Sequence, residues 1–283
     1  YLFDRTTNKP ALLFRSMDWI DTSKMAASRP IEFKNRNGET LTGLYTAPLG
    51  KTGPQPMIVM AHGGPYGVKD EWGYDADVQF LANRGYAVLQ VNYRGSSGRG
   101  DAFERSTWRQ WGTGIQDDIT DGVKWTIAQQ LADPGKICTY GVSFGGYTAL
   151  MNPIRNPGMY KCAIGFAGVC DLPKLVRSED GGSKQGVAYN ERTIGTDMAA
   201  LADQSPVQRI ADLLVPVFLI HGKSDSVVPY DQFEAMDFAL KKAKKPYESL
   251  VKQNEGHGFY DIKNKTEVYE RMEAFLKKYN PAQ

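Results

Sequence analysis

The fold is decided by the stretch Gly141-Val142-Ser143-Phe144-Gly145-Gly146, which follows the short apolar run 136–140. This pattern is typical of a nucleophile elbow, in which a strand turns sharply into a helix and a serine at the bend presents its hydroxyl. Glycines on both sides of Ser143 leave room in so tight a turn, because a Cβ there would crowd the neighbouring strand or helix. The stretch therefore predicts that Ser143 is a nucleophile.

A serine nucleophile needs a base within hydrogen-bond reach and an acid that orients the base. In folds with this elbow the three residues follow one another as serine, aspartate and histidine. Asp225 comes just after the strand-like run 215–220, and His257 lies between two glycines after the strand candidate 247–251. Ser143, Asp225 and His257 are thus the predicted triad.

Rival residues for these roles are few, since the chain has only three histidines. His221 ends a buried-looking strand, so we expect it to be a packed or hydrogen-bonded core residue. Asp231 lies beyond Pro229, and we expect it to open the next helix.

Acyl transfer also needs donors for the oxyanion, and backbone N–H groups serve well because they are already oriented. One is expected from Phe144, the residue after the nucleophile. The apolar strand candidate 57–61 runs into His62-Gly63-Gly64-Pro65, whose glycines allow the backbone to turn its amides toward a substrate. Gly64 is the predicted second donor.

Five motifs form one set: His62-Gly63-Gly64-Pro65, Asn92-Tyr93-Arg94-Gly95-Ser96, Gly141-Val142-Ser143-Phe144-Gly145-Gly146-Tyr147, His221-Gly222 with Asp225, and Glu255-Gly256-His257-Gly258-Phe259. Together they resemble the catalytic domain of the prolyl oligopeptidase family, in its acylaminoacyl-peptidase and dipeptidyl-peptidase branch. The resemblance covers roughly residues 30 to 280. It implies an α/β-hydrolase fold, the triad and the oxyanion donors named above.

The resemblance also concerns the substrate pocket. Tyr189-Asn190-Glu191-Arg192, in the insertion 172–202, is similar to a family segment whose aromatic ring walls the acyl pocket, although Tyr189 could equally be an exposed surface tyrosine. We expect the cleft to be open, with the insertion and the loop from His62 to Tyr66 as its walls. Val227 occupies a place where family peptidases often carry a polar side chain that grips the substrate, which puts exopeptidase activity in doubt.

The alternation of apolar runs with helical patterns predicts an α/β fold, with a mostly parallel sheet, helices on both faces and an antiparallel hairpin at its start. The expected strands are 31–33, 41–46, 57–61, 87–92, 137–140, 162–166, 217–220 and 248–251, and the expected helices include 75–83, 115–130 and 267–279. Helix content should exceed strand content.

The chain begins with an alternating segment, 1–14, that predicts a single β-hairpin. In the resembled family such a hairpin and a linker like 16–29 end a β-propeller, so the expected division is residues 1–30 as hairpin and linker and 31–283 as catalytic domain. The chain could be a fragment, a processed form or a hydrolase that lost its gate, and we favour a fragment.

Composition excludes several classes of protein. With 283 residues, 41% hydrophobic content and a net charge of +2, the chain suits one large core and gives no sign of a nucleic-acid or membrane partner. No apolar run reaches the roughly 18 residues of a membrane span, residues 1–5 do not read as a signal peptide, and a cytoplasmic location is weakly favoured as an expectation. No metal-ligand or phosphate-loop spacing occurs, so no metal or cofactor is expected. Cys138 and Cys162 are expected to be small buried apolar residues.

Three functions remain open. The first is a serine peptidase that cleaves short peptides through an acyl-enzyme. The second is a carboxylesterase that uses the same triad on short-chain acyl or aryl esters. The third, a binding domain without catalysis, is disfavoured by the intact triad. The sequence leaves open whether the chain forms an oligomer.

Overall fold

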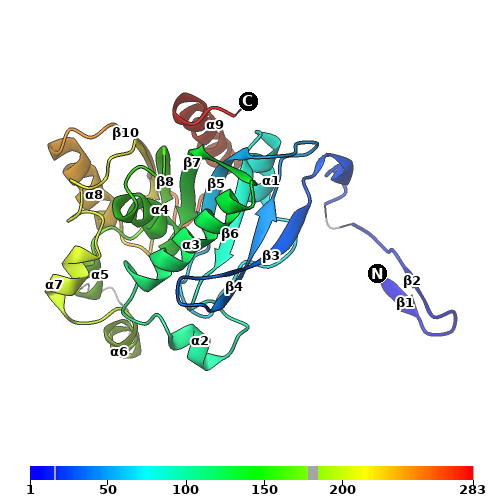
Figure 1. The fold of residues 1–283 in the computed structure, drawn as a ribbon, viewed down its shortest axis with the longest axis horizontal. Helices are drawn as coiled ribbons and strands as arrows, with labels where there is room; N and C mark the ends of the chain where they lie inside the picture. The colour runs from blue at the N-terminus through cyan, green and yellow to red at the C-terminus, as the bar shows by residue number, and fades with distance from the viewer. Residues whose placement is uncertain (16, 178–183, 283) are drawn as a thin grey trace.

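The computed structural model describes residues 1–15, 17–177 and 184–282, and its centre is a twisted sheet (Figure 1). This sheet has eight strands in the order β10-β9-β8-β7-β5-β6-β4-β3. The strands are β3 (Ser28–Lys34), β4 (Thr40–Thr46), β5 (Gln55–Ala61), β6 (Ala87–Asn92), β7 (Ala132–Val142), β8 (Cys162–Phe166), β9 (Val217–Gly222) and β10 (Tyr247–Lys252).

Strands β5 to β10 run parallel, whereas β4 is antiparallel to both β3 and β6. The turn between β3 and β4 contains Gly38 at a φ of 82°, a conformation that favours glycine. The predicted α/β architecture, a mostly parallel sheet that begins with an antiparallel hairpin, is therefore confirmed.

Helices cover both faces of the sheet, as a parallel sheet requires. They are α1 (Ala76–Asn83), α2 (Asp101–Arg105), α3 (Gly114–Ala128), α4 (Phe144–Arg155), α5 (Leu172–Arg177), α6 (Lys184–Thr193), α7 (Met198–Asp203), α8 (Tyr230–Lys242) and α9 (Ile262–Tyr279). Apolar side chains of α3, α4 and α8 form one core with the sheet, and those of α1 and α9 form the other. Helices hold more of the described residues than strands do.

The helix boundaries follow local capping chemistry. Asp75 caps α1 by accepting a hydrogen bond from the Val78 amide, and Asp231 lies in the first turn of α8, as predicted. Helix α9 begins at Ile262 rather than at Glu267, because Asp261 caps it. The described part of the predicted insertion 172–202 forms three short helices, α5 to α7, and residues 178–183 lie outside the described residues.

The predicted N-terminal hairpin consists of β1 (Leu2–Asp4) and β2 (Lys9–Ala11), and it projects away from the rest of the molecule (Figure 1). Its apolar side chains are exposed. The linker that follows contains a short 3-10 helix, Thr22–Lys24, and Ser16 lies outside the described residues. No helix in the described ranges is long and apolar enough to cross a membrane.

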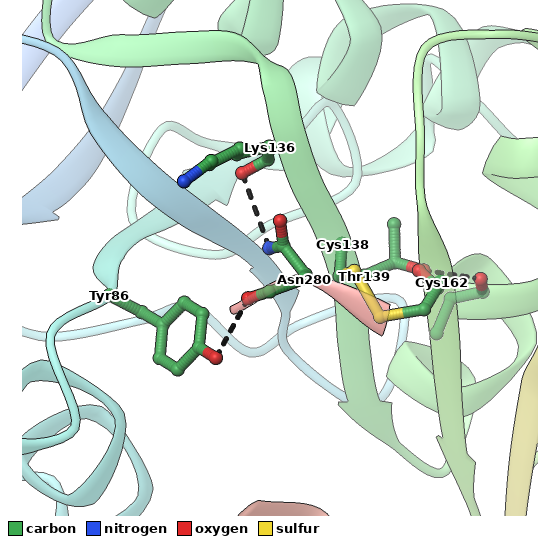
Figure 2. Close-up of a disulfide and its surroundings, with 7 residues drawn as sticks. Tyr86, Lys136, Cys138, Thr139, Cys162 and Asn280 are labelled. Atoms are coloured by element: carbon green, nitrogen blue, oxygen red, sulfur yellow. Dashed lines mark hydrogen bonds between the residues drawn. A yellow bond between two sulfur atoms is a disulfide. The ribbon is translucent and has the colours of Figure 1, made fainter. Parts of the chain in front are cut away.

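Cys138 on β7 and Cys162 on β8 form a disulfide (Figure 2). Both are buried, as predicted, but the expectation of two separate apolar side chains was wrong. The physical reason is the register of the sheet, which sets Cys138 directly opposite Cys162 with their Cα atoms 4.8 Å apart. That separation lies within the usual range for a disulfide.

Candidate active site

Ser143 lies at the turn between β7 and α4, where it is the N-cap of the helix. Its φ of 62° and ψ of −125° place it in a region that non-glycine residues rarely adopt. Glycines make this turn possible: a Cβ at Gly141 would collide with the backbone of Gly145, and one at Gly145 would collide with the carbonyl oxygen of Ala61. The predicted steric role of these two glycines is confirmed.

Asp225 follows β9, and its side chain is completely buried. Its Oδ1 accepts hydrogen bonds from the backbone amides of Val227 and Val228, at 2.8 and 2.9 Å. Its Oδ2 lies 2.8 Å from Nδ1 of His257. Burial opposes ionisation of this carboxyl, but the hydrogen bonds from His257 and from the two amides outweigh burial and lower the pKa of Asp225 below its ordinary value.

The structure brings Asp225 and His257 into direct contact and leaves Ser143 without a hydrogen bond to His257 among the described residues. All three follow the carboxyl ends of parallel strands, which is where open α/β sheets bind ligands. Hydrogen bonds between a nucleophile and its base are often long without substrate and tighten when substrate binds. Ser143 and His257 can therefore act as a pair although they are not hydrogen-bonded here.

His221, at the end of β9, is a buried core residue, as predicted. Its Nε2 lies 3.0 Å from the carbonyl oxygen of Val228 and 3.4 Å from Oδ2 of Asp225. Burial lowers the pKa of His221, and its neutral ring donates from Nε2 to the carbonyl oxygen of Val228. The contact with Asp225 was not predicted, because only the three-dimensional path of the loop after β9 brings the two side chains together.

The loop after β5 carries the second predicted oxyanion donor. Gly64 has a φ of +115° and is exposed, and a Cβ there would approach Cγ2 of Val68 to 2.7 Å. The other predicted donor, Phe144, lies in the first turn of α4, with its side chain buried. Both residues line the same cleft as Ser143.

His62 holds this loop in place. Its Nε2 lies 2.8 Å from Oγ of Ser96, and its Nδ1 lies 3.0 Å from the hydroxyl of Tyr93. Burial lowers the pKa of His62 to about 4, so the ring is neutral near pH 7. The sequence pattern included His62 and Ser96 in two separate motifs but gave no sign that their side chains meet.

The cleft has a volume of about 200 Å³. Tyr66 and Tyr189 form part of its walls, and Tyr189 is also 43% exposed. Val227 also lines the cleft and is 60% exposed. Trp111, which comes just before α3, lines it as well and was missed, because nothing in its local pattern distinguishes it from a core tryptophan.

No charged side chain lines the cleft within the part of the chain that the structure describes, and none of the described residues of 1–30 does so. The remaining lining residues are small, apolar or polar and neutral: Pro65, Val169, Leu175, Asn190, Thr193, Ile194, Ser226, Val228 and Pro229. In the same described ranges no group of three or more His, Cys, Asp or Glu residues could hold a metal ion. The cleft thus offers a neutral, largely apolar surface next to the serine.

Comparison with known proteins adds an independent observation. Residues 72–282 match the sequence profile of a family described as the prolyl oligopeptidase family. Dipeptidyl aminopeptidase BIII of Pseudoxanthomonas mexicana is 28% identical over 289 residues, which cover 98% of this chain and 42% of that protein. Dipeptidyl peptidase family member 6 of Caenorhabditis elegans is 30% identical, with 79% of this chain and 31% of that protein covered.

Solved structures of peptidases also resemble this chain. A puromycin-hydrolyzing peptidase of Mycobacterium tuberculosis has a TM-score of 0.85 and 26% identity, and the match covers 94% of this chain and 41% of that one. The chain therefore spans less than half the length of the relatives it matches.

Proposed function

This chain belongs to the prolyl oligopeptidase family of serine peptidases, and from that premise we propose that Ser143, Asp225 and His257 are its catalytic triad. The observation that carries the proposal is the 2.8 Å hydrogen bond between His257 and the buried Asp225, at the same end of the sheet as the strained Ser143. A carboxylate in this position fixes the tautomer of the imidazole and stabilises the cation that forms during catalysis.

The proposed reaction proceeds in two steps through an acyl-enzyme. Oγ of Ser143 attacks the carbonyl carbon of the substrate while Nε2 of His257 takes the hydroxyl proton, and the same nitrogen then returns that proton to the leaving group. Water, activated by His257, next attacks the ester and releases the acyl group. The amides of Phe144 and Gly64 would donate to the oxyanion of each tetrahedral intermediate, and the N-terminus of α4 adds a favourable dipole.

The proposed substrates are short peptides or blocked amino acids whose acyl residue is uncharged. The cleft beside Ser143 is lined by neutral side chains in the described part of the chain. A charged residue would lose its hydration there without gaining a partner, and that loss costs several kcal/mol.

A carboxylesterase acting on short-chain acyl or aryl esters is the second candidate, and the exposed Val227 favours it. Valine cannot donate a hydrogen bond to a peptide substrate, so the leaving nitrogen of an amide would be poorly placed against His257. Esters have better leaving groups and depend less on placement.

Two substrates separate these candidates. The chain and its Ser143→Ala variant would be assayed with an aminoacyl anilide and with a short-chain aryl ester under identical conditions. A peptidase should turn over both, whereas an esterase should turn over the ester alone. If the Ser143→Ala variant kept the activity of the wild type, neither candidate would stand.

We also propose that residues 1–30 are a hairpin and linker and that residues 31–283 are the catalytic domain. The projecting β1–β2 hairpin suits a segment that packs against a further domain, such as the propeller that precedes the catalytic domain in the family. Exposed apolar residues such as Leu2, Phe3 and Leu13 would gain a partner in that arrangement. Without such a domain the cleft would be open, and the isolated chain would then favour esters.

The Cys138–Cys162 disulfide gives information about the cellular compartment of the protein. Structural disulfides are rare in the cytosol of most organisms, so the pairing weighs against the cytoplasmic expectation and favours an oxidising compartment. Alkylation of the denatured protein with and without a reductant, followed by mass spectrometry, tests this. Modification of Cys170 alone without the reductant would support the proposal, and modification of all three cysteines would contradict it.

A further inference from the structure

The loop between β10 and α9, residues 253–261, carries His257 and is closed by the side chain of Glu255. This side chain is buried, since Glu255 is only 3% exposed. Its Oε2 accepts a hydrogen bond from the Tyr260 amide at 2.8 Å, and its Oε1 accepts one from the Asp261 amide at 3.1 Å. The loop therefore folds back around His257 onto a single carboxylate.

Two further contacts anchor Glu255, one through its side chain and one through its backbone. Nδ2 of Asn264, in the first turn of α9, donates to Oε1 at 2.7 Å. The backbone oxygen of Glu255 accepts from the amide of Ser224 at 2.9 Å, in the loop that carries Asp225. Glu255 thus connects the loop of the proposed acid, the loop of the proposed base and the start of α9.

The charge of Glu255 is compensated by donors rather than by a cation. Burial opposes its ionisation, but the hydrogen bonds from Asn264, Tyr260 and Asp261 hold the pKa of Glu255 below its ordinary value. The N-terminus of α9, which begins at Ile262, also favours a negative charge nearby. The carboxylate of Asp261 acts against ionisation, but the three donors outweigh it, so an ionised carboxylate fits this position.

His257 itself has few restraints. Its side chain is 24% exposed, and the hydrogen bond to Asp225 is its one side-chain hydrogen bond among the described residues. Glycines flank it on both sides and add backbone freedom. The imidazole can therefore meet Asp225 and Ser143 reproducibly only if the rest of the loop is held.

We infer that Glu255 is a positioning residue for His257: its buried carboxylate closes the loop that carries the imidazole, and its backbone oxygen ties that loop to the loop of Asp225. This inference rests on the proposed function, because it assigns Glu255 a role through the proposed base. Glu255 touches neither substrate nor reacting atoms. It acts by keeping the imidazole where proton transfer is possible, and a displacement of about 1 Å at such a site lowers the rate about a hundredfold.

The variant Glu255→Gln tests the inference with a side chain of the same size. The NH2 group of glutamine is a donor and would face one of the three N–H groups that now donate to the carboxylate. At least one of these three hydrogen bonds is therefore lost. Glu267→Gln is the matched control, because Glu267 on α9 is paired with Lys252 and does not contact the loop. We expect Glu255→Gln to lower kcat roughly tenfold to a hundredfold with KM nearly unchanged, and Glu267→Gln to change neither.

The double variant with His257→Ala separates positioning from general damage. If Glu255 acts through His257, then Glu255→Gln should cause no further loss of the residual turnover once His257 is replaced. An additional tenfold loss in that background, or an unchanged kcat in the single variant, would overturn the inference.

A measurement that does not depend on turnover tests the positioning role of Glu255 separately from the proposed function. The proton between Nδ1 of His257 and Oδ2 of Asp225 should give a downfield NMR signal in the wild type and in Glu267→Gln, and Glu255→Gln should weaken or shift it. If this pattern were seen but Ser143→Ala retained full activity, the positioning would stand and the proposed function would fail. An identical signal in Glu255→Gln and the wild type would overturn the positioning.

Discussion

Oδ2 of Asp225 and Nδ1 of His257 lie 2.8 Å apart, although 32 positions separate them in the chain. Their strands explain this: β9 and β10 are parallel neighbours, with His221 opposite Val251 and Gly222 opposite Lys252. The two loops that follow therefore leave the sheet side by side. The proposed acid and base meet because two strands end at the same level of one sheet edge.

Replacement of the proposed nucleophile gives the first prediction. We expect Ser143→Ala to fold normally and to lose about 10⁴-fold to 10⁶-fold in kcat, because oxyanion donors and binding alone supply the remaining rate. A serine-directed phosphonate should label the wild type at Ser143 only, as peptide mapping would reveal. The control is Ser106→Ala, because the exposed hydroxyl of Ser106 donates to the carbonyl oxygen of Phe103. Labelling of a different serine would contradict the assignment.

The proposed base and acid should differ in severity. We expect His257→Ala to lower kcat as much as Ser143→Ala does. Asp225→Asn should cause a loss of kcat that is roughly tenfold to a hundredfold smaller, because the imidazole moves the proton whereas the carboxylate only orients the imidazole. Circular dichroism should show the same folded signal for all three variants. Equal losses in Asp225→Asn and His257→Ala would indicate that the carboxylate does more than orient the base.

The pH dependence of the wild type follows from the same pair. The depressed pKa of Asp225 keeps this carboxylate ionised even at the ordinary pKa of an aspartate, so its contribution to stability is fully present above that ordinary pKa and is lost as the pH falls through the lowered one. A histidine acts as a general base only in its neutral form, so kcat/KM of an enzyme with a histidine base should rise with pH between pH 5 and 8. A flat profile over this interval would argue against a histidine base.

Asp70 should make stability depend on pH in the opposite direction. Burial raises the pKa of its carboxyl to about 7, and its buried Oδ2 has no hydrogen-bond partner among the residues that the structure describes. In the unfolded chain an aspartate ionises near pH 4, so the folded state binds more protons between about pH 4 and 7, and stability should fall as the pH rises through that interval.

Asp70→Asn isolates this effect, because the amide stays neutral in both states. The variant should match the wild type near pH 4 and exceed it at pH 8 by no more than about 4 kcal/mol in the free energy of unfolding. The titration of His62 is common to both proteins and cancels in the difference. Urea unfolding at several pH values provides the measurement, and a difference that does not change with pH would show that Asp70 titrates normally.

The sequence predicted the main sheet because each strand is a short apolar run bounded by turn residues. The proposed triad was selected on the same pattern, since each member follows such a run. The Cys138–Cys162 pairing could not be predicted, because it depends on which strands are neighbours and on their register. Glu255 appeared only as one letter of a motif, and its role requires the path of the loop that its side chain closes.

The disulfide should contribute to stability through the unfolded chain. It closes a loop with a sequence separation of 24, which corresponds to roughly 3 kcal/mol of lost chain entropy in the unfolded state. The double variant Cys138→Ala, Cys162→Ala should lose about that amount, and a reductant should lower the Tm of the wild type but not that of the variant. Cys170→Ala should respond to the reductant as the wild type does, and equal responses in all three proteins would exclude a stabilising disulfide.

Val227 offers a way to raise the activity of the cleft toward peptides. It lines the cleft and is exposed, so an arginine there could reach a substrate carbonyl without being buried. A hydrogen bond from a charged donor stabilises by about 1.5 to 3 kcal/mol, so Val227→Arg should raise kcat/KM for an aminoacyl anilide roughly tenfold to a hundredfold, with little change for an aryl ester. Leu214→Arg adds the same charge at another exposed position, outside the residues that line the cleft, and controls for net charge. If both variants changed anilide turnover equally, Val227 would have no part in substrate placement.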